Sequence, residues 1–147
     1  MQGLLARVPE GALRPSLIGL SWLPVCAYTL LIWMLSSQAL TIALIESVPL
    51  QDKGVHFLEY GALGFFMAHA AHVSWPGRPR RYLIAAWLSL GLGLVDELHQ
   101  VYVPGRSGDA ADLAADALGI MLAVLVYSLV RQLLGRRRAR LSSVSPP

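Results

Sequence analysis

A stretch of nineteen residues without a charged side chain, Leu17 to Leu35, constrains the fold more than any other feature of this sequence. At ~1.5 Å of rise per residue, a helix of this length nearly crosses the ~30 Å hydrocarbon layer of a bilayer. A cleaved signal peptide is the alternative, but its apolar region has only ~7–15 residues. Only 14% of the chain is charged, whereas about 25% is usual for a soluble domain. The pattern therefore predicts an integral membrane protein.

Three further apolar segments follow, and each is long enough to form a membrane-spanning helix. Together with the first they predict an all-α bundle of four transmembrane helices in a multi-pass protein of the cell membrane. The predicted spans are residues 17–36, 55–74, 82–101 and 110–131, within a domain of residues 17–133. A basic lead (residues 1–16) precedes this domain, and a basic, Ser/Pro-rich tail (residues 134–147) follows it.

The basic residues are distributed unevenly over the segments that connect the spans. Ten of the twelve lie in the basic lead, in the turn at residues 74–81, or in residues 131–147, and only Lys53 and Arg106 lie elsewhere. Membrane proteins keep their excess of Lys and Arg on the cytoplasmic side. We therefore expect both termini in the cytoplasm and the loops of Lys53 and Arg106 outside. The same distribution accounts for the sequence pI of 9.4 without a nucleic-acid partner.

Three smaller features complete the picture of the bundle. Cys26 is the single cysteine, which excludes a disulfide within the chain. Gly91 and Gly93 predict a close approach of the third helix to a neighbour, because small residues let membrane helices come near one another. His69 and His72 lie near the cytoplasmic end of the second span, and we expect them to be packing or interfacial residues.

Acidic and polar residues recur at helical spacing near the outer ends of three spans. The three sets are Asp52, His56 and Glu59 with Tyr60 beside them; Asp96 and Gln100 with Glu97; and Asp109, Asp112 and Asp116. A carboxylate that faces lipid near mid-membrane costs roughly 2.5–3.5 kcal/mol. The three polar stripes are therefore expected to face one another. Asp52 and Asp109 suit helix caps, where the helix dipole favours negative charge.

Few cations are available to neutralise these carboxylates. An arginine side chain can bind two carboxylate oxygens at once, so we predict that Arg106 holds the acids of the third and fourth spans together. The remaining carboxylates must be protonated, hydrated, or bound to a metal or a cationic ligand, which indicates a functional pocket. Its predicted residues are Lys53, His56, Glu59, Tyr60, Asp96, Glu97, Gln100, Arg106, Asp112 and Asp116.

These motifs resemble those of the VanZ-like membrane protein family. They are Asp52-Lys53-x-x-His56-x-x-Glu59-Tyr60, Asp96-Glu97-x-x-Gln100, Pro104-Gly105-Arg106, Asp112 and Gly119, in the order in which the family has them. The resemblance implies a multi-span membrane protein, and the relatives that give the family its name are linked to resistance against teicoplanin-type glycopeptides. Asp116 departs from the pattern, because many relatives carry Asn there.

Three classes of function fit the predicted pocket. The first is a binding or shielding protein for a cell-envelope ligand or precursor, which would lower susceptibility to glycopeptide antibiotics. The second is a membrane enzyme that uses carboxylates for acid/base chemistry or for a divalent metal, although no tight metal motif such as H-E-x-x-H is present. The third is a proton- or cation-coupled carrier, for which four spans are few unless the chain forms a homo-oligomer. Membrane lipid is a further expected partner, because the Arg136–Arg140 run suits contact with anionic lipid.

Overall fold

The computed structural model describes residues 10–38 and 51–144, and the chain is helical in nearly all of them. The helices are α1 (Glu10–Ser36), α3 (Gln51–Ser74), α4 (Arg81–Gln100) and α5 (Ala110–Val144). These residues contain no strand, so the all-α prediction is confirmed for them. The last helix starts where the sequence predicts, but it continues through Arg131 into the basic segment that follows.

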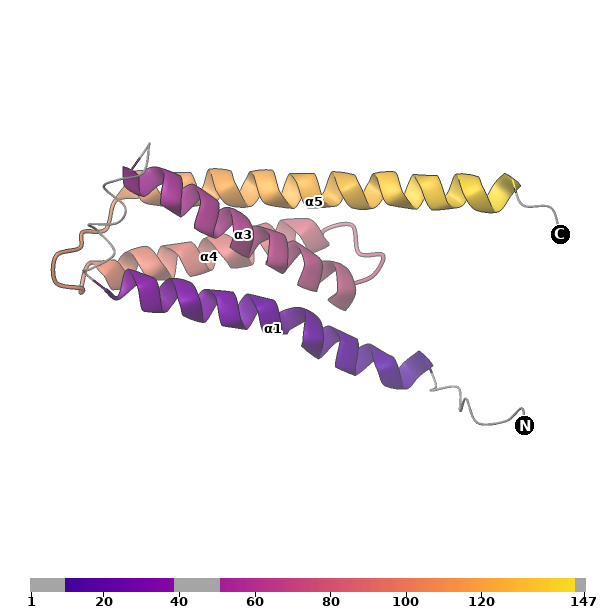
Figure 1. The fold of residues 1–147 in the computed structure, drawn as a ribbon, viewed down its shortest axis with the longest axis horizontal. Helices are drawn as coiled ribbons and strands as arrows, with labels where there is room; N and C mark the ends of the chain where they lie inside the picture. Colours follow the sequence, from indigo (N-terminus) through magenta and orange to yellow (C-terminus); the bar gives the residue numbers. More distant parts are fainter. Residues whose placement is uncertain (1–9, 39–50, 145–147) are drawn as a thin grey trace.

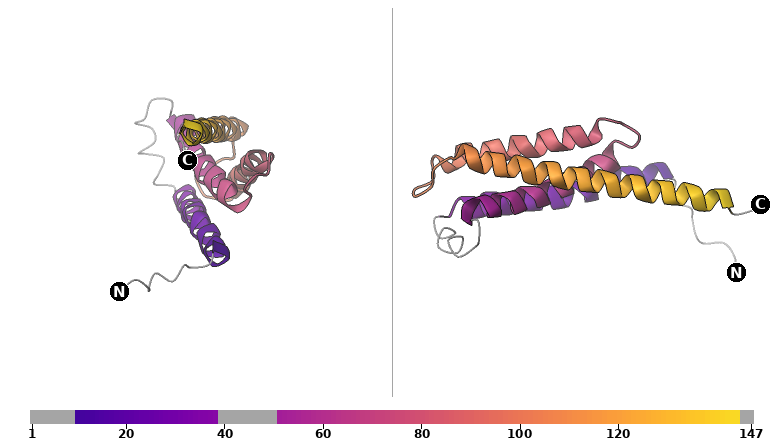
Figure 2. Two further views of the ribbon diagram at one scale, coloured as in Figure 1. Left: turned by 90° about the vertical axis from the view of Figure 1, so that its right-hand side faces the viewer. Right: turned by 90° about the horizontal axis from the view of Figure 1, so that it is seen from above.

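The helices lie side by side and alternate in direction (Figure 1). One end of the bundle gathers the C-terminal ends of α1 and α4 and the N-terminal ends of α3 and α5. The opposite end holds the start of α1 and the turn between α3 and α4, and α5 projects beyond that turn (Figure 2). The central helix is α3, which packs against α1, α4 and most extensively α5. The first residue of α1 and the last residue of α5 thus lie toward the same end.

Two of the described helices are long and apolar enough to cross a membrane. They are α1 over Pro15–Ser36 and α5 over Ala110–Leu141, with mean hydropathies of 1.8 and 2.2. The other two helices do not meet this measure. Polar residues lower their hydropathy, among them His56 and Glu59 in α3 and Asp96 and Glu97 in α4.

Large apolar side chains cover the outer surfaces of α1 and α5. Leu20 and Leu23 on α1 and Leu118 and Met121 on α5 each expose 60% or more of their surface. Soluble monomers rarely expose large contiguous apolar patches, whereas lipid tails are as apolar as leucine. These surfaces are therefore those of a chain surrounded by lipid.

Small residues bring α3 and α5 into close backbone contact. A Cβ atom on Gly119 would collide with the carbonyl oxygen of Phe57, and one on Gly64 would lie 3.0 Å from the Cα of Ile120. On α4, a Cβ on Gly93 would lie 3.1 Å from Asp116 Oδ2, which agrees with the predicted close approach. The same prediction is wrong for Gly91, which has nothing within 4 Å, because it lies on the outer side of α4.

We expect Gly119→Ala to lower the melting temperature of the detergent-solubilised protein clearly. The added methyl group meets backbone on α3, which cannot rotate away, and overpacking of this kind costs about 1–3 kcal/mol. Gly91→Ala is the matched control, because it adds the same methyl group to open space and improves helix propensity. Equal melting temperatures for the two variants would show that the α3–α5 contact does not limit stability.

Candidate functional site

Lys53 forms the ion pairs that join the beginnings of α3 and α5. Its Nζ atom lies 2.6 Å from Asp109 Oδ2 and 2.6 Å from Asp112 Oδ1. The hydrogen bond to Asp109 raises the pKa of Lys53, and the same bond lowers the pKa of Asp109. Both groups lie outside the predicted spans. Lys53 is half-exposed, whereas Asp112 is buried, so the lysine lies between the buried acids and the surroundings.

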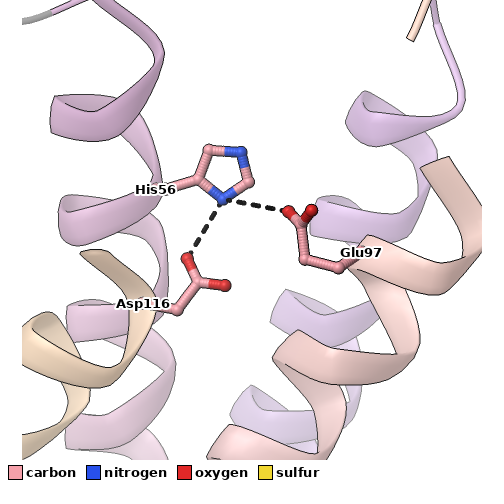
Figure 3. Close-up of side chains that lie close together, drawn as sticks. All are labelled: His56, Glu97 and Asp116. Atoms are coloured by element: carbon pink, nitrogen blue, oxygen red, sulfur yellow. Dashed lines mark hydrogen bonds and ion pairs between the residues drawn. The ribbon is translucent and has the colours of Figure 1, made fainter. Parts of the chain in front are cut away.

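Behind this pair, His56 from α3 meets acids from α4 and α5 (Figure 3). Its Nδ1 atom lies 3.0 Å from Asp116 Oδ1 and 3.9 Å from Glu97 Oε1. On the other side of the ring, Nε2 lies 4.0 Å from Asp112 Oδ2. His56, Glu97 and Asp116 are all buried, and each offers one ligand atom within 4.8 Å of the others. We call these three residues the His–acid cluster.

The loop between α4 and α5 is attached to the cluster through its backbone. The N–H of Asp109 donates to Glu97 Oε2 at 2.9 Å. Asp109 also accepts the N–H of Ala111 at 2.8 Å, which caps α5 and confirms the cap predicted from the sequence. Earlier in the loop, Gly105 has φ of 82°, a left-handed conformation that glycine adopts without strain.

Asp96 belongs to a separate and fully satisfied arrangement. It accepts the hydroxyl of Ser36 at 2.6 Å and the amide of Gln100 at 3.1 Å. With Tyr60 it lines a small cavity of about 50 Å³ between α1, α3 and α4. Ser36 was not predicted as a site residue. Its position at the end of an apolar run was the only signal, since a hydroxyl there must find a polar partner inside the bundle.

Negative charge at the end of α4 is unfavourable by itself. Asp96 and Glu97 lie near the C-terminal end of that helix, where the macrodipole disfavours anions. Asp96 is compensated by its two donors, but Glu97 Oε1 and Asp116 Oδ2 are buried without a hydrogen-bond partner among the described residues. Buried polar atoms are usually paired. The His–acid cluster is therefore an arrangement that a proton, a metal ion or a cationic group would complete.

The structure brings most of the predicted pocket residues to one end of the bundle, which we call the acidic end. At its centre, His56 lies within 4.0 Å of Glu97, Asp112 and Asp116. Lys53 pairs with Asp112 on the exposed side of these residues. Tyr60, Asp96 and Gln100 form the neighbouring arrangement, and Glu59 is only partly buried beside Tyr60. The side chain of Asp52 lies outside the described residues.

The predicted role of Arg106 is not what the structure shows. Within the described part of the chain it forms no ion pair, and its Nε atom has no hydrogen-bond partner. Lys53 takes the predicted bridging position instead. The reason is the path of the loop, in which the Asp109 backbone reaches Glu97 and Asp109 itself turns toward α3.

The two histidines at the far end of α3 pack as predicted. His69 Nδ1 lies 3.0 Å from the hydroxyl of Tyr127, and His72 Nδ1 lies 3.0 Å from that of Tyr82. Sixteen residues of helix, about 24 Å, separate His72 from His56. Neither histidine takes part in the His–acid cluster.

Comparison with known proteins agrees with the motifs. The family profile described as VanZ/LLP1 matches residues 14–131. The chain belongs to the VanZ/LLP1 family. The match contains all of the acidic end, the apolar part of α1 and most of that of α5, and together with these two helices it identifies a VanZ-like membrane protein. No curated protein and no solved structure matches the chain.

We expect Lys53→Met to lower the melting temperature more than Arg106→Met does, because only Lys53 has ion-pair partners in the described residues. The two variants are matched, since each replaces one positive charge by the same apolar side chain. A carboxylate with a lowered pKa stabilises the fold above its unfolded pKa and loses that contribution as the pH falls through its folded pKa.

The destabilisation by Lys53→Met should therefore shrink as the pH is lowered below the ordinary Asp value of about 3.9. Thermal unfolding of both variants over a pH series measures this. If Arg106→Met lowers the melting temperature more than Lys53→Met at neutral pH, Arg106 is the bridging residue, as the sequence predicts.

Proposed function

We propose that the chain crosses the membrane four times, with both termini in the cytoplasm and the acidic end at the outer surface. The alternating direction of the described helices supports this arrangement (Figure 1). The 20 residues of α4 span about 30 Å, which is the thickness of the hydrocarbon layer. The polar residues that lower the hydropathy of α3 and α4 lie largely at the acidic end, turned toward other helices rather than toward lipid.

Reporter fusions at Trp75 and Ser107 should give opposite signals for cytoplasmic and external location. Trp75 lies in the basic turn between α3 and α4, and Ser107 lies in the loop between α4 and α5. The positive-inside rule assigns Trp75 to the cytoplasm. If both fusions report the same side, α4 does not cross the membrane and the four-span arrangement is wrong.

For the acidic end, we propose that it binds a cationic group of a cell-envelope ligand at the outer leaflet. The observation that carries this proposal is the excess of buried carboxylates over cations in the described residues, among which Glu97 Oε1 and Asp116 Oδ2 have no donor. An ammonium or metal ion supplies the missing positive charge without a change of fold. Lys53 then acts as the exchangeable cation, because it is half-exposed and its partners among the described residues are Asp109 and Asp112.

Binding of this kind would connect the site to glycopeptide antibiotics. These drugs act on cell-envelope precursors outside the membrane, and the relatives that give the family its name are linked to resistance against them. A protein that occupies or shields such a precursor at the outer leaflet would lower access of the antibiotic. The acidic end is then the surface that contacts the precursor.

A membrane enzyme is the second candidate, and the His–acid cluster is the observation that favours it. One imidazole nitrogen and two carboxylate oxygens within 4.8 Å of one another suit a divalent transition metal such as Zn²⁺ or Mn²⁺. His56 would then exchange its hydrogen bond with Asp116 for a bond to the metal. A metal held there would polarise an oxygen of an envelope substrate or activate a water molecule.

Glu97→Gln and Asp116→Asn should leave the melting temperature equal or higher and should abolish function. Each keeps the side-chain shape and removes a charge that is not fully compensated in the described residues. Asp96→Asn is the contrasting control. Both oxygens of Asp96 already accept hydrogen bonds, so Asp96→Asn removes no unpaired charge and weakens two charge-assisted bonds, and the melting temperature should not rise.

Three measurements on the same membranes separate the candidates: protein abundance, metal content of the purified chain, and teicoplanin susceptibility of the expressing cells. Stoichiometric metal that is lost in Asp116→Asn favours the enzyme. Loss of the susceptibility phenotype without bound metal favours the binding protein. If Glu97→Gln and Asp116→Asn reduce abundance but keep activity per molecule, these acids support the fold and the site assignment fails.

A further inference from the structure

A second polar site lies at the end of the bundle opposite the acidic end. It is a cavity of about 460 Å³ between the α3–α4 turn and α5. Small-molecule pockets typically have volumes of about 300–1,000 Å³. Its lining includes four arginines, Arg78, Arg81, Arg131 and Arg138, together with His72 and Tyr82. We call it the basic cavity.

No carboxylate neutralises these arginines from the segments that form the cavity. The sequence has no Asp or Glu between residues 60 and 95 and none after residue 116. The start of α4 is also at this cavity. It has no acidic residue in its first turn and no side-chain cap, so the positive end of its dipole is uncompensated as well. The cavity therefore combines four guanidinium groups with a helix N-terminus.

Two of the arginines are held in place by neighbouring aromatic and imidazole groups. Arg131 donates from Nη2 to His72 Nε2 at 2.7 Å, and the other nitrogen of that ring meets the Tyr82 hydroxyl at 3.0 Å. Arg81 lies over the ring of Tyr82, 4.9 Å from its centroid. Arg131 Nε remains buried without a hydrogen-bond partner in the described residues. Arg81 and Arg131 are thus preorganised, and Arg131 keeps a donor that has no partner in the described residues.

We propose that the basic cavity binds a phosphate group. Arginine matches phosphate oxygens in bidentate geometry, and a helix N-terminus is a ready anion site. Two sources carry this chemistry: the headgroup of an anionic lipid, and a soluble phosphate monoester. The proposal does not depend on any function of the acidic end.

The four-span arrangement would place the arginines of the basic cavity at the level of the lipid headgroups. Arg81 begins α4, and Arg131 lies about 32 Å along α5 from its first residue. If both helices cross a ~30 Å hydrocarbon layer, these arginines lie at the same headgroup level. This placement rests on the four-span arrangement proposed above, whereas the binding of phosphate does not.

The test uses the purified full-length chain in detergent and measures lipid binding by native mass spectrometry. Phosphatidic acid should bind, and phosphatidylcholine should bind much more weakly. In the double variant Arg78→Gln/Arg138→Gln, affinity for phosphatidic acid should fall at least about tenfold, equivalent to ~1.4 kcal/mol. Both side chains line the cavity and are exposed, so their loss should not disturb folding.

The matched control is Arg136→Gln/Arg137→Gln. It removes the same number of positive charges from the same end of the bundle, but neither residue lines the cavity. Its affinity should stay close to that of the unchanged chain. Arg131→Lys, which keeps the charge but loses the planar fork, should weaken binding like the cavity pair.

Inorganic phosphate added as a competitor distinguishes the two sources. Displacement of phosphatidic acid by comparable concentrations of phosphate supports a soluble monoester as ligand, and failure of displacement supports the lipid. If the cavity pair and the control pair lower the affinity for phosphatidic acid equally, the proposal is wrong, because binding would then depend on the overall positive charge of this end and not on the cavity. Equal binding of phosphatidylcholine would overturn it too.

Discussion

The close approach of α3 and α5 is the constraint on which the acidic end depends. Gly61 and Gly64 on α3 lie against the backbone of Gly119 and Ile120 on α5. A separation this small leaves no room for side chains between the helices there. His56, just over one turn before Gly61, is therefore forced against Asp116, just under one turn before Gly119. The fully buried contact between an imidazole and a carboxylate follows from backbone packing elsewhere in the helix pair.

Opposite charges are segregated to the two ends of one narrow bundle. Lys53 is the only described cation in contact with the acids of α5 at the acidic end, apart from His56 itself. At the other end, the arginines around His72 and Tyr82 have no acidic neighbour in the adjoining sequence. The two ends are therefore suited to ligands of opposite sign.

Helical spacing was enough to predict which residues would converge, because carboxylates in an apolar segment have few alternatives to facing one another. It identified the stripe of Asp112 and Asp116 and placed His56 opposite to them. It could not predict Lys53 as their partner in place of Arg106. That outcome depends on the exact path of the α4–α5 loop, which the hydrogen bond from the Asp109 backbone to Glu97 determines. Ser36 was missed for a similar reason, since its partner Asp96 is 60 residues away. Gly91 and Gly93 lie on different sides of α4, and the sequence alone does not tell which side faces a neighbouring helix.

The length of α5 has a mechanical consequence. Its 35 residues contain no proline and extend about 52 Å, so Asp112 and Asp116 near one end and Arg131 and Arg138 near the other belong to one rod. A rod that is tightly packed against α3 cannot slide or turn at one end alone. A rigid shift of α5 along α3 that changes the spacing between Asp116 and His56 would also move Arg131 relative to His72. The two polar ends of the molecule are therefore joined through the backbone of one continuous helix.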